Sequence, residues 1–173
     1  PRPMGETTEL AAESFCDVVR DHARNQREVI AFSYASEDIS FAEIDAGADR
    51  VANGLVALGV KAGDRVAFLG KNHPLYFEAF LGANRIGAVM TPINWRLAAP
   101  EVAYVLDNSQ ARIVFVGEGF AEVLGQIRPD CPHVEQVIGI DAPDFRGTDY
   151  RTWRDGFPAS PPATSRRSPA GPR

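Results

Sequence analysis

Short apolar runs that alternate with segments of helical spacing limit this chain to a small set of folds. Four such runs occur, at Val66–Leu69, Val89–Ile93, Arg112–Val116 and Val134–Ile140. Helices are predicted between them at Leu75–Gly87, from Pro100 through Leu106, and at Phe120–Arg128. Buried strands that alternate with helices indicate a mainly parallel sheet with helices on both faces. The predicted fold class is therefore α/β.

The first 60 residues predict two further helices and a hairpin. An amphipathic helix is expected within Thr8–Asn25, followed by a small β-hairpin whose turn is Ala35–Asp38. Ser40 and Glu43 have the spacing of a capping box, in which the serine and the glutamate each satisfy a backbone N–H of the helix start. Apolar residues then recur every three or four positions up to Gly59, where the left-handed conformation that glycine tolerates ends the helix.

Composition and charge narrow the classes of partner. The chain has 173 residues, a length that suits one domain, and its net charge of −5 argues against nucleic acid as the main ligand. Its apolar stretches are shorter than the roughly 20 residues that span a bilayer, and it begins without an export leader, so a cytoplasmic protein is expected. Cys16 and Cys131 stand alone, which argues against a disulfide scaffold or a zinc ribbon.

The alternating pattern fades after Tyr150, and the last 18 residues differ in composition from the rest. Residues 156–173 hold five prolines, three arginines and one large apolar side chain, Phe157. Such a segment buries too little surface to offset its ordering entropy, so a disordered tail is predicted. Its Pro, Ala, Arg and Gly content also fits a frameshifted reading frame. The predicted organisation is a disordered leader at 1–7, one α/β region at 8–155 and the tail.

One turn resembles part of a dinucleotide-binding fingerprint. Gly117 and Gly119 follow a predicted strand and precede a predicted helix, and Asp141 lies after the next strand. Glu122 occupies the position of the third glycine, where its side chain would oppose close packing and repel a pyrophosphate. An ordinary strand-to-helix turn is the competing interpretation, so Gly117 and Gly119 are weak cofactor-binding candidates.

A second candidate is the loop Asn94, Trp95 and Arg96, which follows a predicted strand end where α/β proteins often bind ligands. The arginine beside the tryptophan could contact an anion, or could stack on the indole in a purely structural loop. His73 precedes Pro74 and is predicted to be a helix cap or a loop residue rather than a general base, since no carboxylate is obviously paired with it. The sequence offers no catalytic residue and no metal-ligating set.

An ordered series of short segments resembles the N-terminal region of AMP-forming acyl-CoA synthetases, which belong to the adenylate-forming superfamily. The series comprises Ile39–Ile44, Ala52–Leu55, Leu58–Ala67, Asn72–Pro74, Arg85–Val89, Pro92–Leu97 and Asp107–Ser109. The resemblance covers roughly Thr8 to Trp153, and Pro92–Val102 is most similar to bacterial fatty-acid–CoA ligases.

The resemblance implies that ATP and a fatty acid or other carboxylate form an acyl-adenylate, from which coenzyme A displaces AMP with help from Mg²⁺. The family's phosphate loop, its aspartate and its C-terminal lysine find no counterpart here, so the chain is expected to be an inactive N-terminal fragment. A sheet normally covered by later strands would leave an open edge that favours self-association. A free-standing nucleotide-binding module and a non-catalytic interaction domain are the alternatives.

Overall fold

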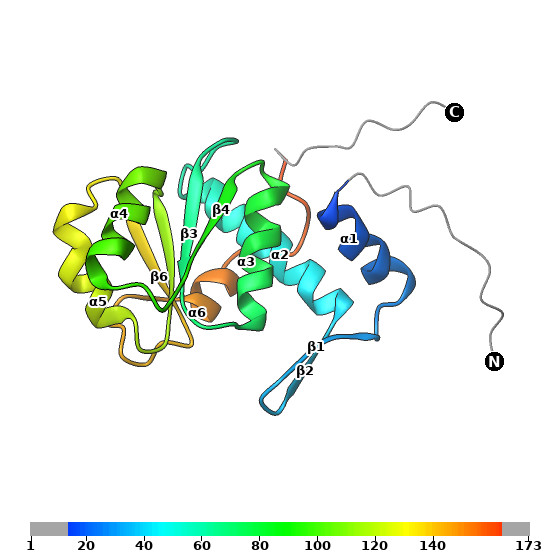
Figure 1. Ribbon diagram of the computed structural model, residues 1–173. Coiled ribbons are helices and arrows are strands. Elements are labelled where there is room, and N and C mark those ends of the chain that lie inside the picture. Colours follow the sequence, from blue (N-terminus) through cyan, green and yellow to red (C-terminus); the bar gives the residue numbers. More distant parts are fainter. Residues whose placement is uncertain (1–13, 164–173) are drawn as a thin grey trace.

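A five-stranded parallel sheet forms the centre of the protein, in a computed structural model that describes residues 14–163 (Figure 1). The strand order is β4-β3-β5-β6-β7, and every neighbouring pair is parallel. The sheet strands are β3 (Arg65–Leu69), β4 (Val89–Ile93), β5 (Ile113–Gly117), β6 (Gln136–Ile140) and β7 (Thr148–Asp149). The predicted α/β class is confirmed.

Helices cover both faces of this sheet and build two separate cores. One face packs against α2 (Phe41–Ala57), α3 (Pro74–Arg85) and α6 (Tyr150–Asp155). The other face packs against α4 (Ala99–Ser109) and α5 (Ala121–Ile127), and the short 3₁₀ helix η1 (Arg128–Asp130) continues from α5 beside α4. A third apolar cluster joins the outer side of α2 and α3 to α1 (Phe15–Asn25) and to the antiparallel hairpin β1 (Ile30–Tyr34) and β2 (Glu37–Ser40). The α2–α3 pair is therefore a layer between the sheet and α1 (Figure 1).

The local signals around α2 are confirmed in atomic detail. The Glu43 N–H donates to Ser40 Oγ at 3.3 Å, and the Ser40 N–H donates to Glu43 Oε2 at 2.8 Å. These two bonds form the predicted capping box. At the other end, Gly59 adopts a φ of +76°, the left-handed conformation expected of a residue that ends a helix.

The hairpin differs from the prediction in the length of its turn. Glu37 and Asp38 were expected in the turn, but they belong to β2 and pair with Tyr34 and Ser33. The chain reverses over two residues because Ala35 adopts a left-handed φ of +54°. Pro92 lies inside β4, where it is tolerated because β4 is an edge strand of the described sheet.

The region after Tyr150 is more ordered than its sequence suggests. Tyr150 begins α6 and is completely buried against the sheet. The chain then runs along α2, where Asn53 Nδ2 donates to the carbonyl oxygens of Pro158 and Ser160 at 3.0 and 2.8 Å. Side chains of α2 thus hold residues 156–163 of the predicted tail through the tail's backbone carbonyl groups. The rest of the tail (164–173), the predicted leader (1–7) and the start of the first predicted helix lie outside the described residues.

Close packing between α2 and α3 gives a stability prediction. A Cβ at Gly82 would lie 2.6 Å from Val51 Cγ1 and 2.9 Å from the Ala48 carbonyl oxygen. Gly82→Ala should therefore lower the free energy of unfolding by about 1–3 kcal/mol through overpacking. Gly125→Ala in α5 is the matched control, because its Cβ meets nothing within 4 Å, and it should add about 0.5–1 kcal/mol. Urea unfolding measures both, and equal effects would contradict the packing argument.

Candidate functional site

The carboxyl ends of β3, β4 and β5 meet at one edge of the sheet and bring the candidate loops together. The crossover helix α3, between β3 and β4, covers one face of the sheet, whereas α4, between β4 and β5, covers the other. The strand order therefore reverses between β3 and β5, which is where open α/β sheets bind ligands. Gly70 and Gly117 end these two strands, and a Cβ at Gly70 would lie 3.3 Å from Gly117 Cα.

Trp95 organises a cluster of cations and aromatic rings at this edge. The Arg96 guanidinium lies 4.1 Å from the centroid of the indole, and Lys71 Nζ lies 5.7 Å from it. Phe120, which follows β5, contacts the same indole edge-on at 6.5 Å. The loop Asn94–Arg96 is closed locally by the Arg96 N–H, which donates to Asn94 Oδ1 at 3.1 Å. The structure thus joins both predicted candidate loops through Trp95 and Phe120.

The two cations of this cluster carry uncompensated charge. Lys71 and Arg96 are exposed, and within residues 14–163 neither forms an ion pair. Both hold positive charge beside an aromatic face, an arrangement that attracts an anionic ligand with a flat group. The geometry at this edge therefore suits an anionic ligand.

The glycine turn is less open to a phosphate than its sequence suggests. Gly119 adopts a φ of +83°, and its N–H donates to Asp144 Oδ1 at 3.4 Å. A carboxylate therefore lies where a dinucleotide phosphate would need the amide. Asp141, the residue placed to contact a ribose, accepts two hydrogen bonds from Arg151 at 3.0 Å each. Gly117 and Gly119 lie at the carboxyl edge of the sheet, but the carboxylate of Asp144 and the pairing of Asp141 with Arg151 disfavour a dinucleotide there.

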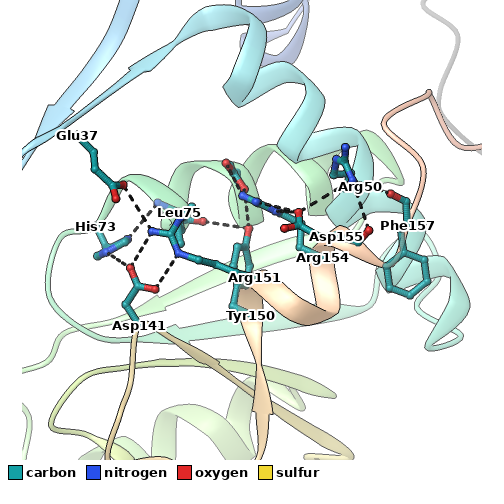
Figure 2. A network of polar contacts seen from close by, with 11 residues as sticks. Glu37, Arg50, His73, Leu75, Asp141, Tyr150, Arg151, Arg154, Asp155 and Phe157 are labelled. Atoms are coloured by element: carbon teal, nitrogen blue, oxygen red, sulfur yellow. Dashed lines mark hydrogen bonds and ion pairs between the residues drawn. The ribbon is translucent and has the colours of Figure 1, made fainter.

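His73 joins the start of α3 to the end of β6 (Figure 2). Its Nδ1 accepts from the Leu75 N–H at 3.2 Å, so of the two predicted roles, cap or loop residue, the structure shows the helix cap. Its Nε2 lies 3.2 Å from Asp141 Oδ2, so the histidine does pair with a carboxylate that the sequence did not reveal. Arg151 extends this chain of contacts to Glu37 in β2 at 3.7 Å. The four side chains connect the hairpin, α3, β6 and α6.

The pKa values of this network follow from burial and from Arg151. Burial lowers the pKa of His73, and the attraction of Asp141 only partly offsets it. Hydrogen bonds from Arg151 lower the pKa of Asp141 below its ordinary value. At neutral pH the imidazole is therefore uncharged, with Nδ1 accepting from the backbone and Nε2–H donating to the carboxylate. A pocket of about 250 Å³ lies between this network and the hairpin tip.

A second polar network lies along α6 and lines a cleft of about 470 Å³ (Figure 2). Glu78 is almost completely buried, accepts from Tyr150 Oη at 3.1 Å, and pairs with Arg154 Nη1 at 2.9 Å. Burial raises the pKa of Glu78 despite the nearby guanidinium. Arg50 donates to the Phe157 carbonyl oxygen at 3.3 Å. These charges satisfy one another, so the network attaches α6 to α2 and α3 rather than presenting free groups to a ligand.

Several contacts at this edge escaped the sequence interpretation, although one rule could have brought most of their residues together. Lys71, His73, Phe120 and Asp141 all follow the carboxyl ends of parallel strands, which share one edge of the sheet. Applying that rule to every predicted strand end places Lys71, the Trp95 loop, His73 and Asp141 at the same edge of the sheet, whereas the strand order decides which of them lie side by side. Arg151 could not be found in this way because α6 was not predicted.

The described residues contain neither a cluster of metal ligands nor a membrane-spanning helix. Between residues 14 and 163, no three His, Cys, Asp or Glu side chains gather as a set that could hold a metal ion. The helices in this part of the chain are also too short or too polar to cross a membrane.

Comparison with known proteins identifies the family. The family model described as AMP-binding enzyme matches residues 19–171. The long-chain-fatty-acid–CoA ligase FadD13 of Mycobacterium tuberculosis is 40% identical over 130 residues, which are 72% of this chain and 26% of that protein. The fatty acid–[acyl-carrier-protein] ligase ScoC of Streptomyces coeruleorubidus is 31% identical over 77% of this chain and 24% of its own length. The chain belongs to the AMP-binding enzyme family.

Solved structures agree with this assignment. The fatty acyl CoA synthetase of Mycobacterium tuberculosis aligns with a TM-score of 0.77 and 34% identity over 87% of this chain and 30% of that one. The N-terminal domain of FACL13 from the same organism aligns with a TM-score of 0.79 and 32% identity over 88% of this chain and 38% of that domain. The chain spans about a quarter of the length of the curated relatives given above.

The neutral state of His73 predicts how stability depends on pH. Because its pKa is lowered from 6.5 in the folded protein, the unfolded chain binds more protons as the pH falls below about 6.5. Stability should then decrease as the pH falls through the folded pKa. In His73→Asn, the amide oxygen keeps the cap without a titrating group, so this part of the loss should vanish. Urea unfolding of both proteins between pH 7.5 and 5 tests this, and parallel profiles would contradict it.

Proposed function

We propose that this chain supplies the N-terminal part of an ATP-dependent acyl-CoA ligase, an enzyme that activates a carboxylic acid as an acyl-adenylate and transfers the acyl group to coenzyme A. Membership of the AMP-binding enzyme family carries this proposal. We take a fatty acid as the first substrate class to test, which the 40% identity to a long-chain-fatty-acid–CoA ligase supports. ATP, coenzyme A and Mg²⁺ are proposed for the complete enzyme, and a cytoplasmic location stays a prediction.

The carboxyl edge of the sheet is the part of the chain that we assign to this reaction. Arg96, Lys71 and Trp95 lie at the strand-order reversal, and the two cations lack acidic partners among the described residues. Adenosine triphosphate and coenzyme A both carry phosphates and an aromatic base, which suit a cation beside an indole ring. We propose that this cluster contacts a phosphate of one of these two substrates. No residue of the chain is assigned to the chemical step.

A chimera tests the proposal directly. Residues 14–163 would replace the aligned region of the M. tuberculosis FadD13 ligase, and fatty-acid-dependent AMP release would be measured with ATP and coenzyme A. We expect the chimera to release AMP and the 173-residue polypeptide alone to release none. Arg96→Ala should raise the KM for ATP or coenzyme A about tenfold or more, the equivalent of one charge-assisted hydrogen bond.

Arg24→Ala is the matched control for this substitution, because Arg24 is an exposed arginine on α1, away from the sheet edge. Its KM values should equal those of the unmodified chimera. A folded chimera without fatty-acid-dependent AMP release would count against the proposed function. An active chimera with unchanged KM values in Arg96→Ala would count only against the role of Arg96.

We also propose that the isolated chain associates with itself through β4. This strand pairs only with β3 in the described sheet, and its Val89 side chain is 51% exposed. An open, apolar strand edge is a template for another strand. Val89→Lys should shift sedimentation velocity profiles from oligomer toward monomer, because a charge on the edge opposes pairing. Val56→Lys, on exposed α2 surface, is the control, and a wild-type monomer at high concentration would refute the proposal.

A further inference from the structure

An apolar pocket lies on the outer side of the α2–α3 layer, away from the sheet and its carboxyl edge. It has a volume of about 240 Å³ and is enclosed by α1, the hairpin, α2 and α3. Nine of its ten lining side chains are apolar, including four phenylalanines at positions 15, 32, 41 and 77. The two other cavities described above are lined by several charged side chains. This pocket therefore differs in chemistry from those two cavities.

The walls of the pocket are fixed by their own packing. Phe32 stacks on Phe77 with ring centroids 4.7 Å apart, and His22 lies 4.8 Å from Phe41. The floor consists of Val19, Ile44 and Leu81, which are buried members of the third apolar cluster. Because the walls are held in this way, the pocket is a preformed cavity rather than a gap that side chains could close at no cost.

Histidine 22 is the one polar side chain in the lining, and half of its hydrogen-bonding capacity is already used. Its Nδ1 lies 2.9 Å from the Val18 carbonyl oxygen, and because a carbonyl oxygen only accepts, Nδ1 must donate. The other ring nitrogen, Nε2, is left for a ligand. The lining thus offers a ligand one polar atom among nine apolar side chains.

We propose that this pocket is a second binding site, which takes an uncharged aromatic molecule of one or two rings. The volume of the pocket fits a ligand of this size, because an apolar cavity of about 150 Å³ already binds benzene. The four phenylalanines favour aromatic ligands, because edge-to-face and offset contacts between rings add binding free energy to that of the buried apolar area. A carboxylate or phosphate is disfavoured in the interior because no lysine or arginine lines the pocket to compensate its desolvation. The α2–α3 layer separates this site from the carboxyl edge, so the inference goes beyond the proposed ligase function.

Nuclear magnetic resonance of the 173-residue chain, with indole as the probe, tests the proposal. We expect saturable shifts of the Val19, Ile44 and Leu81 methyl groups, and unchanged methyl groups of Val102, Leu106 and Leu124 in the core on the opposite face. Val18→Trp should fill the pocket and weaken indole binding at least tenfold, and Ala31→Leu should fill it from the hairpin side. Val56→Trp, on the exposed surface of α2, should bind indole like the wild type.

Three results would overturn the proposal. The first is the lack of saturable shifts up to the solubility limit of indole. The second is equal shifts in the core on the opposite face, which would indicate non-specific partitioning. The third is binding only after deletion of residues 1–13, which would mean that the chain's own N-terminal segment occupies the pocket. If both filling variants unfold, the location of the shifts in the wild-type chain still decides the question.

Discussion

A parallel sheet is stable only when both of its faces are covered, and this requirement organises the whole molecule. Strands β3 and β5 are buried on both sides, with Val66, Ala67, Val114 and Phe115 at or near zero exposure. On one side, α2 and α3 approach closely at Gly82 and are tied by the ion pair between Arg85 Nη1 and Asp49 Oδ1 at 2.7 Å. Both side chains of that pair are buried, so the cost of removing their charges from water offsets much of their attraction. Well-formed hydrogen bonds between the two groups are therefore needed to hold the pair together. The remaining elements, α1 and the hairpin, pack on the outer side of the α2–α3 layer.

The α2–α3 layer, which covers one face of the sheet, also separates two kinds of surface. Its inner side packs on the sheet, whose carboxyl edge collects polar loops because successive parallel strands all end there. Its outer side presents Ile44, Ala48 and Leu81, which α1 and the hairpin cover without filling the space completely. One sheet and one helix pair therefore produce a charged edge on one side of the layer and an apolar pocket on the other. Neither feature depends on a residue of the other.

Local patterns in the sequence predicted the elements whose causes are local. The capping box of Ser40 and Glu43 and the left-handed Gly59 depend on residues a few positions apart, and both were predicted at the right place. The helix α6 was missed because its stability comes from long-range contacts. Tyr150 is buried against Phe115 and hydrogen-bonds Glu78, two residues far away in the chain. At the candidate site the sequence located the Trp95 loop, but the pairing of His73 with Asp141 depends on strand order, which composition and periodicity do not contain.

Charge pairing separates the polar groups that hold the fold together from those that are available to a ligand. Asp141 contacts both Arg151 and His73, so its carboxylate is neutralised within the protein. Glu78 is likewise satisfied by Arg154. The cations beside Trp95 have no such partner among residues 14–163, although holding like charges near one ring costs electrostatic energy. Exposed Arg24 also has no ion pair among these residues, so what distinguishes Lys71 and Arg96 is the aromatic ring that they share at the carboxyl edge of the sheet, next to the strand-order reversal where open α/β sheets bind ligands.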